Sequence, residues 1–181
     1  METYKQRLKR FTEGPPNESI GTLTNSIANF FINNELEIAC QKKLWSLLIV
    51  GIFAVIETVA DVLYGNSREI KNIKKYHKIF IDSDGINCDF SKIADEINEW
   101  RNALAHKWIY KKGHYLYPNP SMKEGWKREN GTLIVNPKIY YECFKRAFGT
   151  NGKMWQLEDI FSEAQLLNGK NRMIKKFMGV D

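Results

Sequence analysis

The sequence predicts an all-α protein, an up-and-down helical bundle with a small β-hairpin inserted after its best-defined helix. Two observations support this fold class. Apolar residues recur at spacings of three and four along most of the chain, as they do on the buried face of a helix. Glycine and proline gather in residues 109–136, where short aromatic and β-branched runs replace the helical spacing.

The chain has 181 residues, a length typical of a single domain, and we treat residues 1–181 as one helical domain. Hydrophobic residues make up 43% of the chain and aromatic residues 13%, which excludes a disordered protein and a collagen-like one. The net charge of +6 permits a nucleic acid or another anionic partner without identifying one.

The three cysteines, Cys40, Cys88 and Cys143, are widely separated and include no CxxC pair. Such a set favours neither a disulfide framework nor a zinc site, so we expect reduced thiols. The N-terminal segment is charged and lacks the apolar stretch of a secretion signal. Together these features predict a cytoplasmic protein.

The first third of the chain predicts a lead-in and two helices. Residues 1–16 form a basic lead-in that ends at two prolines, and a helix follows from Asn17 to a break at Asn33-Asn34. A long apolar helix is expected from Leu36 to Tyr64, ended by glycine. Its uncharged stretch of 13 residues is too short to span a membrane, which favours a central core helix and no membrane partner.

The middle of the chain predicts two further helices joined by a polar turn. Residues 67–80 form a basic helix, and residues 82–89 form the turn, whose glycine is misplaced for a calcium-binding loop. The helix from Ser91 to Trp108 is the best defined of all. Its apolar stripe consists of Ile93, Ile97, Trp100 and Leu104.

After this helix, residues 109–136 predict an irregular insertion with a hairpin around Glu129-Asn130-Gly131. Pro137 favours a helix start, and that helix is expected to end at Phe148. A last amphipathic helix is expected over residues 154–167, followed by a basic tail over residues 168–181.

The string Arg101-Asn102-Ala-Leu-Ala-His106 lies near the end of the best-defined helix. If the apolar stripe faces inward, Asn102 and His106 face roughly outward, together with Asp95 and Glu99. Arg101 lies on the flank, about 140° around the helix from His106. One copy of the helix therefore presents half a site, and a two-fold dimer would bring two copies together.

These three residue types suit metal-independent cleavage of a phosphodiester. Histidine gives or takes a proton near neutral pH. Arginine is a permanent cation whose planar donors match a phosphate, and asparagine orients a hydroxyl or phosphate oxygen. Proton transfer and stabilisation of the developing charge are what the reaction requires.

Arg101, Asn102 and His106 resemble the Arg-x4-6-His signature of the HEPN superfamily (higher eukaryotes and prokaryotes nucleotide-binding). The resemblance implies a helical bundle, homodimerisation through the motif helix and, in active members, an endoribonuclease without cofactor or metal. Such enzymes use the RNA 2′-hydroxyl as nucleophile and leave a 2′,3′-cyclic phosphate. Many act as toxins or in antiphage defence, which implies an antitoxin protein as a possible partner.

The sequence departs from one branch of these toxins two residues after the histidine. That branch carries a tyrosine there, which its nucleotidyltransferase antitoxin modifies, whereas this chain has Trp108. Neutralisation by that route is therefore in doubt, although Tyr110 lies close by in the sequence.

Charge changes sign at the motif. Residues 82–99 are acidic and residues 107–128 are basic, with aromatic residues among the cations. Cations follow a phosphate backbone and aromatic rings stack on unpaired bases, so this segment predicts a surface for single-stranded RNA. The residues we expect to bind substrate are Lys107, Tyr110, Lys111 and Lys112.

Two alternatives to a ribonuclease stay open. One is a non-catalytic HEPN-like dimerisation module that binds RNA, a nucleotide or a protein, in which Arg101 pairs with Asp95 or Glu99 of the opposite subunit. The other is an unrelated helical protein in which the motif occurs by chance.

Other titratable residues give weaker signals. His77 lies among lysines and is expected to be solvated, while His114 lies in the insertion and is a weaker candidate for the site. Glu57 and Asp61 share one helix face, which favours a solvated or partner-facing edge of the central helix over a pair of catalytic carboxylates.

Overall fold

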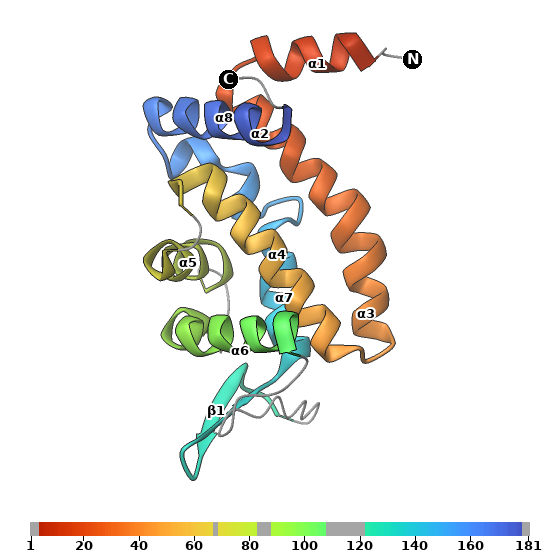
Figure 1. Cartoon of the computed structure of the whole chain (residues 1–181), viewed down its shortest axis with the longest axis vertical. Coiled ribbons are helices and arrows are strands. Elements are labelled where there is room, and N and C mark those ends of the chain that lie inside the picture. The colour runs from red at the N-terminus through yellow and green to blue at the C-terminus, as the bar shows by residue number, and fades with distance from the viewer. Residues whose placement is uncertain (1–3, 67–68, 83–87, 108–121, 179–181) are drawn as a thin grey trace.

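A computed structural model describes residues 4–66, 69–82, 88–107 and 122–178. For residues 105–107 it describes the backbone and not the side chains. The chain forms an all-α bundle with one small antiparallel hairpin after the motif helix, as the sequence predicts (Figure 1).

The N-terminal half consists of a short helix, a long helical path and the central helix. The short helix is α1 (Tyr4–Glu13). The long path is built from α2 (Pro16–Ser26), a π-helical stretch η1 (Ile27–Leu36) and α3 (Glu37–Gln41). The central helix α4 (Trp45–Tyr64) runs back beside this path (Figure 1).

The predicted break at Asn33-Asn34 is wrong, because the helical path continues through both residues. The wider π-helical turn leaves room for the Asn34 side-chain amide, which donates to the carbonyl of Asn29 at 2.7 Å. The chain turns instead after Gln41, where Lys43 adopts a positive φ of 58°. The predicted end of the central helix at Tyr64 is correct.

The motif helix is reached through two shorter elements. Helix α5 (Ile70–Tyr76) continues into the π-helical stretch η2 (His77–Ile81). A 3-10 turn, η3 (Phe90–Ile93), then leads into the motif helix α6 (Ala94–Lys107).

The hairpin and the helix after it form where the sequence predicts them. Strands β1 (Trp126–Glu129) and β2 (Thr132–Val135) pair antiparallel around Asn130 and Gly131. Helix α7 (Pro137–Ala147) starts at the predicted proline. Asn136 caps it by accepting hydrogen bonds from two backbone amides of its first turn.

The end of the chain differs from the prediction. In place of a helix over residues 154–167, two 3-10 turns, η4 (Lys153–Trp155) and η5 (Leu157–Asp159), precede helix α8 (Glu163–Met178). Ser162 and Gln165 begin α8 with reciprocal hydrogen bonds between side chain and backbone, which is a capping box.

The predicted basic tail is also wrong, because most of it belongs to α8 and packs on the core. Lys170 is buried and donates to the carbonyl of Gly14. Arg172 donates to the carbonyls of Val62 and Leu63 at 2.7–3.0 Å. These carbonyls belong to the last turn of α4, where an α-helix has no internal donors left.

Helix α4 lies at the centre of the fold and contacts α5, α6, α7 and α8. Its buried residues, among them Leu48, Ile52, Ile56 and Val59, form one broad apolar face. Within the described residues it is the one helix long and apolar enough to cross a membrane by length and composition. Its packing is that of the central core helix predicted from the sequence.

Cys88 and Cys143 form a disulfide, contrary to the expectation of reduced thiols. The two residues are 55 positions apart in sequence, but the packing of α7 against the segment before α6 brings their Cα atoms within 6.4 Å. Cys40 keeps a free thiol, whose pKa is raised by burial and by the nearby Glu37 carboxylate.

His77 is buried, contrary to the prediction of a solvated histidine. Its Nδ1 lies 2.8 Å from the carbonyl of Ile73, and its Nε2 lies 2.8 Å from the hydroxyl of Tyr140. A carbonyl can only accept, so Nδ1 carries the proton and Nε2 accepts from Tyr140. Burial lowers the pKa of His77 to about 4.

We expect His77 to make the protein less stable in acid. The unfolded chain binds a proton at His77 below pH 6.5, whereas the folded chain resists protonation down to about pH 4. As the pH falls from 6.5 to about 4, the free energy of unfolding should therefore decrease, by about 3 kcal/mol from this group. Urea unfolding of the wild type and of His77→Gln across this range measures it. The other titrating groups are common to both proteins, so parallel curves would contradict the prediction.

Candidate functional site

Helix α6 is placed by a cap at its start and by its apolar stripe. The carboxylate of Asp82 accepts hydrogen bonds from the backbone amides of Phe90 and Ser91 at 2.8 and 2.9 Å, where the η3 turn begins. All four predicted stripe residues are buried, Ile93 at the end of η3 and the other three in α6. The helix therefore faces the core with the side that the sequence predicts.

Arg101 lies against α4 and forms an ion pair with Glu57. Its side chain is only 14% exposed, and its guanidinium lies 5.7 Å from the centre of the Phe53 ring. Burial lowers the pKa of Arg101, but an arginine remains a cation at neutral pH. Its Nε is buried and has no hydrogen-bond partner within the described residues.

Asn102 and Glu99 are exposed, which confirms the outward side predicted for α6. The backbone of His106 belongs to the last turn of the same helix, five residues after Arg101. The side chain of His106 lies outside the described residues. The structure brings Arg101 and Asn102 together at neighbouring positions of one helix.

The predicted substrate-binding residues lie at the edge of the described chain. Lys107 is the last residue of α6 and is described by its backbone alone. Tyr110, Lys111, Lys112 and His114 lie outside the described residues.

Part of the basic segment is neutralised within the chain. Arg128 pairs with Glu96 of α6, and Lys127 pairs with Glu129. Trp126 packs against the core and donates from its indole nitrogen to the carbonyl of Asp89 at 3.1 Å. Arg128 and Trp126 thus join the hairpin to α6 and to the segment before it.

The two carboxylates of α4 are not a catalytic pair. Glu57 pairs with Arg101, and Asp61 pairs with Lys176 of α8. Both carboxylates lie on the polar edge of the central helix, as predicted, and each joins α4 to a different neighbouring helix.

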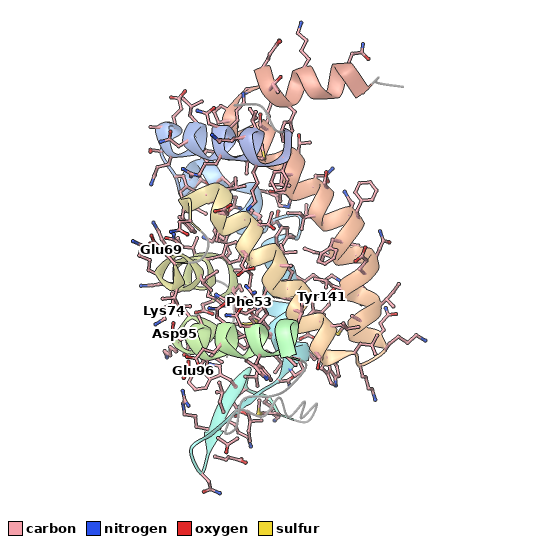
Figure 2. All side chains as sticks on the ribbon, viewed as in Figure 1. Phe53, Glu69, Lys74, Asp95, Glu96 and Tyr141 are labelled. Carbon is pink, nitrogen blue, oxygen red and sulfur yellow. A yellow bond between two sulfur atoms is a disulfide. The ribbon has the colours of Figure 1, made fainter. Side chains whose placement is uncertain are left out.

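Asp95 also has its partner within the chain, Lys74 of α5, at 2.5 Å (Figure 2). Arg101 therefore does not need Asp95 of a second subunit to balance its charge. Glu57 provides that balance within the chain.

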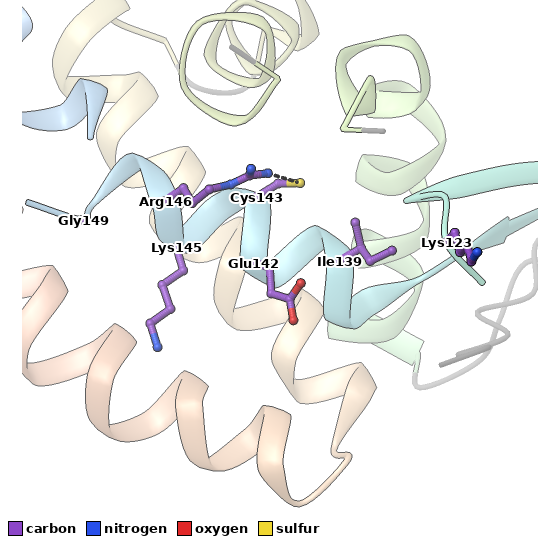
Figure 3. A pocket seen from close by; sticks show the side chains of 7 residues that line it. All are labelled: Lys123, Ile139, Glu142, Cys143, Lys145, Arg146 and Gly149. Atoms are coloured by element: carbon purple, nitrogen blue, oxygen red, sulfur yellow. Dashed lines mark hydrogen bonds between the residues drawn. The ribbon is translucent and has the colours of Figure 1, made fainter. Parts of the chain in front are cut away.

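Sequence reasoning missed a groove along α7, whose volume is about 600 Å³ (Figure 3). Cys143 forms part of its wall, together with Lys123, Lys145 and Arg146. The only sequence signal is that Cys143 lies on the buried face of α7 beside Phe144, which does not reveal its partner Cys88.

Within the part of the chain that the structure describes, no cluster of three or more histidine, cysteine, aspartate or glutamate residues is arranged to hold a metal ion. Comparison with protein-family models, with curated protein sequences and with solved structures gave no match.

We expect the Arg101–Glu57 pair to contribute more to stability than the Lys74–Asp95 pair, which also joins α6 to a neighbouring helix. Its side chains are 14% and 33% exposed, whereas those of Lys74 and Asp95 are 45% and 46% exposed. Solvent screens the exposed pair, so its coupling energy should be at most about 1 kcal/mol. The Arg101–Glu57 coupling should be about 1–3 kcal/mol.

Double-mutant cycles measure both couplings, with Arg101→Gln and Glu57→Gln in one and Lys74→Gln and Asp95→Asn in the other. The second cycle is the matched control, because both pairs join α6 to a neighbouring helix. Equal couplings in the two cycles would show that burial does not strengthen the Arg101–Glu57 pair.

Proposed function

We propose that the protein is a metal-independent endoribonuclease of the HEPN type, with Arg101, Asn102 and His106 as its catalytic residues. The observation that carries the proposal is the way in which the Arg101 guanidinium is held. Its guanidinium is held against α4 by Glu57 and Phe53, at the position before the exposed Asn102, and its Nε has no partner within the described residues. A fixed cation and an exposed amide on the same helix are groups that suit a phosphate.

In the proposed reaction, the RNA 2′-oxygen attacks the adjacent phosphorus, and the bond from phosphorus to the 5′-oxygen breaks. His106 takes part in proton transfer, from the 2′-hydroxyl or to the departing 5′-oxygen. Arg101 stabilises the negative charge that develops on the phosphate oxygens, and Asn102 orients the phosphate or the 2′-hydroxyl. The products are a 2′,3′-cyclic phosphate and a 5′-hydroxyl.

The proposal includes a homodimer formed through α6. Arg101 and His106 lie about 140° apart around one helix, so a second α6 would complete the arrangement. It also includes a cytoplasmic location and a role as a toxin or antiphage effector, with an antitoxin protein as a possible partner. Lys107, Tyr110, Lys111 and Lys112 would contact the RNA backbone and bases in this arrangement.

One observation favours a second candidate function, a non-catalytic binding or dimerisation module. The charge of Arg101 is already balanced by Glu57, which is how an arginine with a structural role is held. In that case the outward side of α6, including Asn102, serves an interface instead of a reaction.

We expect the wild-type protein to cleave single-stranded RNA in the presence of EDTA and to leave a 2′,3′-cyclic phosphate. His106→Ala should lower the cleavage rate by about 100-fold or more, because general acid–base catalysis is lost. Lys92→Gln is the control, since Lys92 is an exposed residue at the start of the same helical segment. It should cleave at the wild-type rate.

Equal cleavage by the wild type and His106→Ala would exclude a catalytic role for this histidine. If the wild type binds RNA without cleaving it, the binding module is the better description. In that case Asn102→Ala should change the molar mass measured by light scattering if the outward side of α6 forms a dimer interface.

A further inference from the structure

The Cys88–Cys143 disulfide joins two parts of the fold that are distant in sequence. Cys143 lies in the middle of α7, and Cys88 lies two residues before Phe90, where the η3 turn into α6 begins. The disulfide therefore ties the entry of the motif helix to α7.

The groove along α7 reaches the disulfide at Cys143. Cys143 contributes to the groove wall, whereas Cys88 is not among the residues that line it. Both cysteines are buried beneath the surface of the groove. A small molecule in the groove thus meets the disulfide from the side of Cys143, and a volume of about 600 Å³ is ample for a short peptide or a metabolite.

Arg146 lies beside both sulfur atoms. Its guanidinium donates to Cys88 Sγ at 2.8 Å and to Cys143 Sγ at 3.0 Å, the second of which Figure 3 shows. A fixed cation at this distance stabilises a thiolate on either sulfur. A disulfide opens faster when its departing thiolate is stabilised, so Arg146 favours exchange at this bond.

The charges around the groove favour an anionic ligand. Lys123, Lys145 and Arg146 line the groove together with one acid, Glu142. The Lys145 ammonium also pairs with Glu37 at 2.5 Å, and Glu142 lies 3.9 Å from the Lys138 ammonium. Cations outnumber acids in this set, and a positive surface raises the local concentration of anions.

We propose that Cys143 is a thiol-exchange site for a small anionic thiol that binds in the α7 groove. The thiolate of the ligand attacks Cys143 Sγ and forms a mixed disulfide, while the Sγ–Sγ bond breaks and its electron pair leaves on Cys88 as a thiolate beside Arg146. A second ligand thiolate attacks the ligand sulfur of the mixed disulfide, releases the oxidised ligand and leaves Cys143 as a thiolate. Two ligand thiols are oxidised and one protein disulfide is reduced.

The exchange has a structural consequence that does not depend on ribonuclease activity. Once the bond is broken, the segment before η3 is held by noncovalent contacts, such as the hydrogen bonds from Phe90 and Ser91 to Asp82. The redox state of the Cys88–Cys143 pair then controls how firmly the start of α6 is fixed to α7.

The test uses full-length Cys40→Ser protein purified without reductant, so that all thiol chemistry comes from Cys88 and Cys143. The probes are reduced glutathione, which is anionic, 2-mercaptoethanol, which is neutral, and cysteamine, which is cationic. Aliquots are quenched with iodoacetamide and analysed by intact mass and peptide mapping. Rates are compared per unit of thiolate for each probe.

We expect the mixed disulfide on Cys143 and the alkyl group on Cys88. Glutathione thiolate should react at least about tenfold faster than cysteamine thiolate. Arg146→Gln should slow the glutathione reaction about tenfold, because the leaving thiolate loses its cation. Arg128→Gln is the matched control, since Arg128 pairs with Glu96 and does not line the groove, and its rate should equal that of the parent.

Four results would overturn the proposal: two alkylated cysteines before any thiol is added, a mixed disulfide on Cys88, equal rates for the anionic and cationic thiols, or no effect of Arg146→Gln. The comparison of the three probes requires no groove variant, so it decides the question even if Arg146→Gln does not fold.

Discussion

The broad apolar face of α4 is the surface around which the other elements are arranged. Its buried residues cover about half of the helix circumference, and they are packed by α5, α6, α7 and α8. An apolar face of this width has to be covered on several sides, because leaving it in water costs about 25 cal/mol per Å². The long helical path from α2 to α3 and the docking of α8 follow from this requirement.

The polar edge and the end of α4 then fix where particular helices lie. Glu57 pairs with Arg101 of α6, and Asp61 pairs with Lys176 of α8. Arg172 supplies donors to the last carbonyls of α4, which the helix itself cannot satisfy. The motif helix and the C-terminal helix are thus held by the same element, through its charged side chains and its unpaired carbonyls.

The fold class could be predicted because it depends on local patterns. The 3–4 spacing of apolar residues gives the inward side of α6, and Asn136-Pro137 gives the start of α7. The capping box of Ser162 and Gln165 was also present in the sequence and would have placed α8 correctly. The error there came from following apolar spacing across Trp155 and Phe161, which belong to 3-10 turns and their flanks.

The remaining errors concern residues whose state depends on tertiary contacts. His77 lies among lysines in sequence, but in the fold the parallel ring of Tyr140 lies beside it and donates the hydrogen bond that water would otherwise provide. Cys88 and Cys143 carry no local sign of pairing, because only the packing of α7 brings them together. The partner of Arg101 is Glu57, which lies 44 positions earlier in the sequence. The spacing of Glu57 and Asp61 predicts a polar edge of the helix but does not predict which residue pairs with it.

The Arg101–Glu57 pair sets the physical condition for any phosphate chemistry at this site. A phosphate that approaches Arg101 meets a guanidinium whose charge is already shared with a carboxylate, so the net attraction is weaker than for an unpaired arginine. The same carboxylate holds the guanidinium in one orientation, which lowers the entropy lost on binding. The ion pair thus weakens binding of the substrate phosphate and at the same time fixes the orientation of the guanidinium donors. This arrangement favours catalysis only if the phosphate carries more negative charge in the transition state than in the substrate. It does so when a 2′-oxygen adds to phosphorus.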